Sequence, residues 1–374
     1  MPRFLMLKHI LGRGLSFDWI LAALLFIVPL LNGFGLRAEL WHALGFCMGA
    51  FALLAISWIS PRKTEWSFSG LTLVVLMGLV VAVITAVSNY PGPAFDRHFM
   101  IYATANGVLY LICGAILITT IAQYSGKELI KWSCLGLSAL NFIFTIYQAF
   151  SCFDKYGAGW WGAFNATGIW YTPSQMGFAS ALSIPFAWVI HPALSVIPIS
   201  SMILSKSATP LAATLIALIA TLVCSRRWVY AGLVTVLSIL AVSSGHVQNR
   251  IDQRFDQRVE ALAYTAKEIQ DHPFIGNGFD TSLNAPMVPT ESGYTYAHND
   301  YLGLARMLGI PAMLIAIGGL IYFLCTSAPS PALFALSVAA IAMAFQTQAW
   351  FPRIMFFICI IVGLAVKEKN AVRL

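Results

Sequence analysis

The amino-acid sequence predicts an all-α polytopic protein that crosses a membrane about twelve times. Of its 374 residues, 59% are hydrophobic and only 10% are charged, whereas soluble domains carry about 25% charged residues. A mean hydropathy of +0.78 agrees with this composition. Because apolar runs recur from one end of the chain to the other, we expect a single transmembrane domain over residues 1–374.

The apolar runs define the predicted membrane spans. The run 16–32 lacks a small-residue cleavage site, so we interpret it as a retained anchor rather than a signal peptide. The runs 193–205 and 207–223 are short, and one broken hairpin is an alternative to two spans. The complete set is 16–32, 40–59, 68–88, 99–122, 132–150, 174–190, 193–205, 207–223, 227–243, 300–325, 331–347 and 352–366.

The basic residues give an orientation. The positive-inside rule assigns the short loops richest in lysine and arginine to the cytoplasm, and it places both termini there. The other side receives the tract 151–173, the segment around Lys206 and the long loop 244–299. The cytoplasmic set is Arg3, Lys8, Arg13, Arg62, Lys63, Lys127, Lys131, Arg226, Arg227, Lys367, Lys369 and Arg373. The formal charge of +7 is thereby explained by topology, and no nucleic-acid partner is expected.

Aromatic residues gather in the tract 151–173. The segment 160–164 reads Trp-Trp-Gly-Ala-Phe, and Trp170 and Tyr171 follow. Such a cluster is typical of an interfacial aromatic belt. A groove whose rings stack on sugars is the alternative.

The loop 244–299 holds a large share of the charge, because eight of the fifteen acids lie between Asp252 and Asp300. Apolar residues at helical spacing predict an amphipathic helix over 250–271 that lies on the membrane surface. These residues are Phe255, Val259, Leu262, Ala266 and Ile269. Within the same segment, three arginines recur every four residues and stack in one column. They are Arg250, Arg254 and Arg258, and the acids Asp252, Asp256 and Glu260 face the other way.

The arginine column indicates an anion, because the guanidinium fork binds phosphate oxygens. A substrate diphosphate is one candidate, and lipid phosphates or acids elsewhere in the fold are the other. No acid pair has metal-ligand spacing, and the seven cysteines show no paired spacing for a disulfide or a metal site. We therefore expect no metal and no cofactor.

A second motif follows the predicted amphipathic helix. The segment 271–279, Asp-His-Pro-Phe-Ile-Gly-Asn-Gly-Phe, ends that helix in a glycine-containing turn, and 298–302, His-Asn-Asp-Tyr-Leu, opens the next span. Asn299 or Asp300 can cap the new helix. A neutral imidazole at this boundary can accept a proton near neutral pH, so His298 is a candidate base, and a structural role is the alternative.

Together these residues resemble the O-antigen ligase/polymerase superfamily, which comprises bacterial inner-membrane glycosyltransferases of the GT-C type. The resemblance rests on Arg258, on Pro273 fifteen residues later, and on the motif from His298 before a glycine-containing span. It is strongest over residues 254–325. A weaker likeness is Lys206, in Ser-Lys-Ser-Ala-Thr at the start of a span, where the family usually has Ser-Arg.

The resemblance implies a donor glycan on undecaprenyl diphosphate and a GT-C-like fold with a periplasmic catalytic loop, 244–299. It makes His298 the catalytic base, and Arg258 and Lys206 the cations that bind the diphosphate; Arg254, from the arginine column, is a further expected substrate contact. Asn299 and Tyr301, from the same motif, are expected substrate contacts. Two departures weaken single contacts: Lys206 offers a point charge in place of a fork, and Leu262 stands where an aromatic residue is common.

Several functions remain open. The favoured one is an O-antigen ligase that transfers the glycan to a lipid A–core hydroxyl in lipopolysaccharide biosynthesis. An O-antigen or exopolysaccharide polymerase would use the same donor, as would a protein O-oligosaccharyltransferase. A transporter or flippase of lipid-linked glycans is the alternative from another class. Ion-coupled transporters usually carry ionisable residues within their spans, whereas the acids here avoid the span interiors almost completely, with Asp18 near one end of a span.

Overall fold

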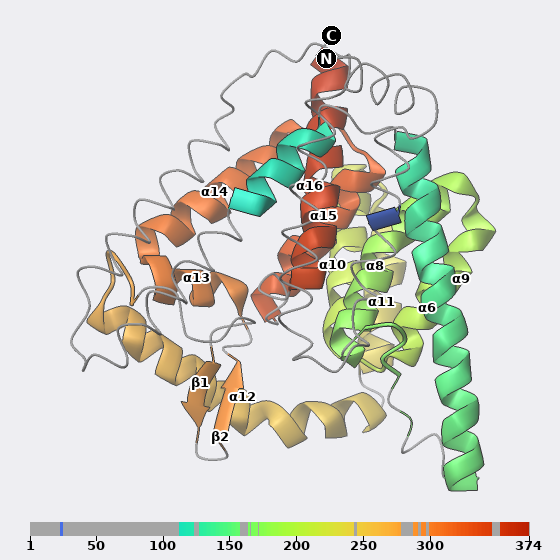
Figure 1. Ribbon diagram of the computed structural model, residues 1–374, viewed down its shortest axis with the longest axis horizontal. Coiled ribbons are helices and arrows are strands. Elements are labelled where there is room, and N and C mark those ends of the chain that lie inside the picture. Colours follow the sequence, from blue (N-terminus) through green and yellow to red (C-terminus); the bar gives the residue numbers. More distant parts are fainter. Residues whose placement is uncertain are drawn as a thin grey trace, which may run out of the picture.

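The computed structural model describes residues 23–24, 112–122, 127–157, 164, 166–170, 172–242, 245–277, 287–290, 293–296, 299–345 and 352–373. The predicted spans 40–59 and 68–88, and nearly all of 16–32, lie outside these ranges. Regular structure within the ranges is helical, apart from one two-stranded antiparallel hairpin (Figure 1). The predicted helical class is therefore confirmed for this part of the chain.

The helices follow the predicted spans closely from residue 173 to residue 242. The runs 193–205 and 207–223 form separate helices. The elements are α6 (Lys127–Tyr156), α8 (Pro173–Ile190), the 3-10 helix η2 (Pro192–Ser195), α9 (Val196–Leu204), α10 (Ala208–Cys224), α11 (Trp228–Val242), α12 (Gly245–Asp271), β1 (Met287–Thr290), β2 (Gly293–Tyr296), α13 (Asp300–Leu308), α14 (Ile310–Thr326), α15 (Pro331–Phe345) and α16 (Pro352–Arg373).

Helix α8 lies at the centre of the packed helices. It contacts α6, α9, α10, α15 and α16, and the side chains of Phe178 and Phe186 are fully buried. Small residues along α8 let its neighbours approach closely. A Cβ atom on Gly177 would lie 2.5 Å from Ser205 Oγ, so the glycine is required for α8 to pack against the end of α9.

Among the described residues, one helix is long and apolar enough to cross a membrane by length and composition, Ile130–Tyr156 within α6. Helix α6 extends past the predicted span 132–150, so the first residues of the tract 151–173 are helical. Shorter apolar helices, of 10–17 residues, are Ile112–Ala122, Pro192–Leu204, Ala208–Cys224, Ile310–Thr326 and Pro331–Phe345.

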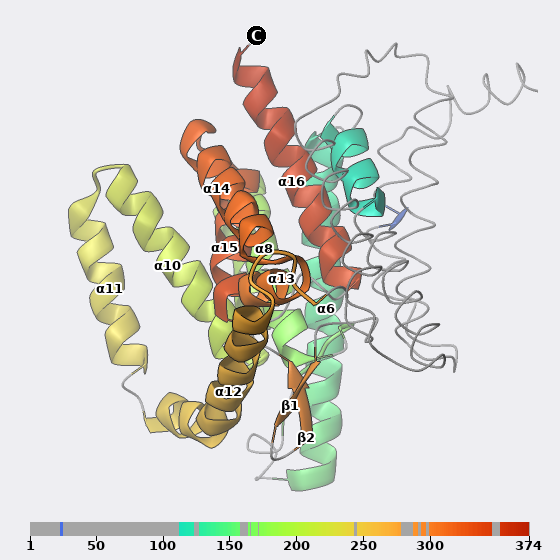
Figure 2. The same cartoon turned by 90° about the vertical axis from the view of Figure 1, so that its left-hand side faces the viewer.

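Helix α12 lies across one end of the helical bundle, where α11 ends (Figures 1 and 2). A helix over the predicted range 250–271 is confirmed, although it begins earlier, at Gly245, and its location on a membrane surface stays a prediction. The hairpin β1–β2 lies beside it, with Met287 paired to Tyr296. The sequence does not predict this hairpin, because each strand is only four residues long.

The predicted span 300–325 is broken into two helices. Helix α13 ends at Leu308, and Gly309, with φ of +87°, separates it from α14. The Gly309 amide donates to Ala305 O at 2.8 Å, and Pro311 lies in the first turn of α14, where its missing N–H costs nothing. The prediction of one continuous span is therefore wrong here, because an apolar run does not reveal a change of helix direction.

Replacing Gly309 by alanine is expected to destabilise the fold. The new Cβ would lie 2.2 Å from Phe274 O, and alanine is unfavourable at the positive φ of this position. We expect the free energy of unfolding to fall by about 1–3 kcal/mol. Gly318→Ala in α14 is the matched control: nothing lies within 4 Å of its Cβ position, so a gain of up to about 1 kcal/mol is expected. The apparent melting temperature of each purified variant in detergent checks this, and equal values for the two variants would contradict it.

Candidate functional site

The start of α13 is fixed by the two side chains that flank Asp300. Asn299 is the N-cap: its Oδ1 accepts from the Leu302 amide at 3.0 Å, and its Nδ2 donates to Ala344 O at 2.9 Å. The Tyr301 hydroxyl donates to Ala340 O at 2.8 Å. The predicted cap is confirmed as Asn299, and both side chains hold α13 against the last turns of α15.

His298, the predicted base, lies outside the described residues. In the sequence it directly precedes Asn299, which the two hydrogen bonds above hold in place. Its catalytic role stays a prediction, as does substrate contact by Asn299 and Tyr301.

Arg258 lies on the face of α12 that packs against the protein. Thr265 and Ile269 follow it at about two and three helical turns, and both are buried, as is Ala261. Arg258 itself is partly buried, and its Nε is shielded from solvent. Arg254 lies one turn earlier in the same helix, with its side chain outside the described residues.

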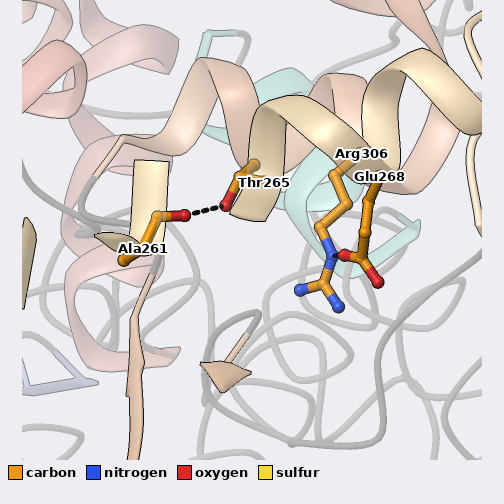
Figure 3. Close-up of polar contacts among 4 residues, drawn as sticks. All are labelled: Ala261, Thr265, Glu268 and Arg306. Carbon is orange, nitrogen blue, oxygen red and sulfur yellow. Dashed lines mark hydrogen bonds and ion pairs between the residues drawn. The ribbon is translucent and has the colours of Figure 1, made fainter. Parts of the chain in front are cut away.

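The buried face of α12 differs from the predicted apolar stripe. Val259 and Ala266 belong to that stripe and are exposed, whereas Ala261 and Thr265 are fully buried. The Thr265 hydroxyl is satisfied within the helix, because it donates to Ala261 O at 2.8 Å (Figure 3). A small polar residue can therefore line a packed helix face. The spacing of hydrophobic residues alone did not predict which side of α12 is buried.

Lys206 lies in the tight turn between α9 and α10. It has a φ of +52°, which is uncommon for a residue other than glycine, and its amide donates to Ile203 O at 3.0 Å. Its Nζ lies 5.6 Å from the centroid of the buried Phe164 ring, within the range of a cation–π contact. Arg226 has a similar φ of +57° in the α10–α11 turn, so this backbone conformation is not specific to the site.

The segment around Phe164 is held on α6 by two polar side chains. Gln148 Oε1 accepts from the amides of Thr167 and Gly168, both at 3.0 Å. Asn141 Oδ1 accepts from the Ile169 amide at 3.2 Å. These bonds fix the part of the aromatic tract that the structure describes, and they place it beside the start of α8.

The structure thus arranges the predicted residues in two groups. Arg258 lies on α12, and Asn299 and Tyr301 lie at the start of α13, which packs against both α12 and α15. Lys206 is held by α9, α10 and Phe164. Among the described residues, no cluster of three or more histidine, cysteine, aspartate or glutamate side chains could hold a metal ion.

Sequence reasoning missed an ion pair between α12 and α13. Glu268 pairs with Arg306 (Figure 3), and both side chains are largely shielded from solvent. A signal was present, because Arg306 stands inside the predicted span 300–325, and an ionisable residue within a span normally has a partner.

Residues 193–317 match the family model described as O-antigen ligase. A search of curated proteins found no match. The match extends from η2 into α14 and includes Lys206, α12 and α13. It confirms the resemblance to the O-antigen ligase/polymerase superfamily, whose members are membrane proteins that act as glycosyltransferase-like ligases or polymerases.

Proposed function

We propose that the protein is an O-antigen ligase-type glycosyltransferase. It moves a glycan from undecaprenyl diphosphate to a hydroxyl of lipid A–core in lipopolysaccharide biosynthesis. The observation that carries this proposal is the placement of Arg258 on the protein-facing side of α12, among buried residues, within the stretch that matches O-antigen ligase. A column that served only to bind lipid phosphates would face away from the helices.

The proposed reaction is a single displacement. The acceptor oxygen forms a bond to the anomeric carbon while the bond from that carbon to the diphosphate oxygen breaks, and undecaprenyl diphosphate leaves with the electron pair. His298 takes the acceptor proton. Attack from the face opposite the leaving group inverts the anomeric centre.

Fixed cations stabilise the leaving group in this proposal. Arg258, with Arg254 and Lys206, offsets the charge that grows on the diphosphate, and cations already in position do so without reorganisation. A divalent metal is therefore not required. Asn299 and Tyr301 contact the substrate from the start of α13, where their hydrogen bonds to α15 hold them in position.

The proposed location is the bacterial inner membrane, with about twelve spans, cytoplasmic termini and the loop 244–299 in the periplasm. The distribution of charge along the helices supports it. Helix α12 lies at one end of the bundle, and the C-terminal end of α16, which carries Lys367 and Lys369, lies at the other (Figures 1 and 2). The basic α10–α11 turn also lies away from α12 (Figure 2).

Cysteine labelling tests this topology. Lys267 and Arg226 are both exposed, and a cysteine introduced at each reports one side of the membrane. Because the positive-inside rule places them on opposite sides, Lys267→Cys should react with an impermeant maleimide in cells whose outer membrane alone is permeabilised. Arg226→Cys should react only after lysis. The reverse pattern would refute the proposed orientation.

A transfer assay with purified protein tests the function. Undecaprenyl-diphosphate glycan is supplied with either lipid A–core or a second glycan-lipid, and the expected product is glycosylated lipid A–core, formed equally in EDTA. Elongation of the glycan-lipid alone would identify a polymerase. Movement of the donor across vesicles without transfer would identify a transporter, and activity lost in EDTA and restored by magnesium would refute the metal-independent mechanism.

A further inference from the structure

The end of α12 is joined to the α13–α14 corner by a compact set of contacts. Besides the pair Glu268–Arg306, the Asn277 amide donates to Arg306 O at 2.8 Å, and the Ile310 amide donates to Pro273 O at 2.8 Å. These bonds tie the segment after α12 to both sides of Gly309.

Two glycines show how close the backbones approach. A Cβ atom on Gly276 would lie 2.4 Å from the carbonyl carbon of Met307, and one on Gly309 would lie 2.2 Å from Phe274 O. Contacts of backbone with backbone leave little room for adjustment. The corner is therefore a rigid joint, and the ion pair lies beside it.

The ion pair is shielded enough to matter energetically. The Glu268 side chain is 21% exposed and that of Arg306 is 11% exposed. Removing one partner of such a pair leaves the other charge poorly solvated, which is costlier than removing a surface pair. The guanidinium also restricts the orientation of the carboxylate, because its donors lie in a plane.

We propose that Glu268 and Arg306 are a positioning pair that sets where Arg258 lies relative to the start of α13; this inference rests on the proposed function. Arg258 is ten residues before Glu268 in one uninterrupted helix, which corresponds to about 15 Å along the axis. Arg306 lies on the nine-residue helix α13, whose start is bonded to α15. The pair thus connects the helix that bears the diphosphate-binding arginine to the helix that follows His298.

The geometry also explains why a distant pair would affect donor binding. Over ten residues a helix moves nearly as a rigid rod, so a tilt at Glu268 displaces Arg258 in the middle of α12. Displacement of a positioned group by about 1 Å can cost on the order of 100-fold in rate. His298 precedes the far end of α13, so its proton transfer should depend less on the pair.

Kinetics of four purified variants test the proposal: Glu268→Gln, Arg306→Gln, the reciprocal exchange Glu268→Arg with Arg306→Glu, and Lys267→Gln. Either single loss of charge is expected to raise KM for undecaprenyl-diphosphate glycan roughly 10- to 100-fold, with a smaller fall in kcat. The exchanged pair should recover part of the loss. Lys267, exposed on the same helix, is the matched control, and its variant should keep both constants.

Hydrogen exchange at the Asn277 and Ile310 amides gives a readout that does not depend on transfer. Both amides should exchange faster in the two single variants than in the wild type or the control. Faster exchange with an unchanged KM would overturn the positioning role and leave the proposed function standing. A wild type with protected amides but no glycan transfer would instead refute the proposed function and this inference with it.

A shorter acidic side chain at position 268 keeps the test decisive if the variant with the exchanged pair does not fold. Glu268→Asp retains the charge, so its donor KM should lie closer to the wild-type value than that of Glu268→Gln. Equal values for Asp and Gln would show that the charge pair does not position Arg258.

Discussion

Replacing Arg258 by alanine is expected to weaken donor binding and turnover together. The guanidinium would contact the diphosphate both before and during bond breaking, so its loss removes stabilisation from the bound donor and from the transition state. A charge-assisted contact contributes about 1.5–3 kcal/mol, equivalent to roughly a 10- to 160-fold fall in kcat/KM. Steady-state transfer kinetics, with donor binding measured by titration, check both effects.

Further substitutions distinguish the effect of positive charge at position 258 from that of the two-pronged guanidinium geometry. Arg258→Lys should recover only part of the loss, because an ammonium cannot make two parallel contacts with phosphate oxygens. Lys206→Arg should be tolerated, since the resemblance described above implies an arginine at this position. Lys267→Ala removes an exposed charge from the other side of α12 and should change nothing. An Arg258→Ala protein with unchanged kcat/KM would exclude diphosphate binding by this residue.

The helices were predictable where hydrophobicity alone decides the structure. Helices α8, α10 and α11 begin and end close to the predicted runs, because in an apolar run a helix satisfies every backbone hydrogen bond within the segment itself. The start of α13 was also predictable, since an asparagine before an apolar run is a standard N-cap signal, and Asn299 caps the helix.

The corner at Gly309 was missed although a local signal was present, because a glycine followed by a proline, here Gly309 and Pro311, is typical of one helix ending and another beginning. An apolar run tolerates both a straight helix and a broken one, and here the Pro273 carbonyl and the Glu268 carboxylate select the broken form. The same limit applies to the buried face of α12. Ala261 and Thr265 are buried because of what packs on them, whereas the exposed Val259 is the more hydrophobic residue.

The position of the candidate site follows from the sequence motifs and the observed packing together. Arginine spacing identified the column, and the buried neighbours of Arg258 show that its side of α12 faces the protein. The sequence motif identified His298, and the hydrogen bonds of Asn299 and Tyr301 show that the helix after it is anchored to α15. An anchored helix start is what a general base requires, because proton transfer depends on a fixed distance to the acceptor hydroxyl.

Replacing His298 by alanine is expected to lower turnover by roughly two to four orders of magnitude while leaving donor binding nearly intact. The imidazole would act only when the acceptor proton is transferred, so the bound donor loses no contact. Single-turnover transfer, measured together with titration of the donor, distinguishes this pattern from the combined loss expected for Arg258→Ala.

Asn299→Ala provides the structural comparison for that experiment. It removes the N-cap bond to Leu302 and the bond to Ala344 O, and each loss costs about 1 kcal/mol of stability. The apparent melting temperature should therefore fall in Asn299→Ala and stay close to the wild-type value in His298→Ala. If His298 only supports the helix start, the two variants should instead melt alike, and His298→Gln should restore transfer. A His298→Ala protein that melts normally and transfers glycan at the wild-type rate would exclude His298 as the base, since loss of the general base must slow the transfer of the acceptor proton.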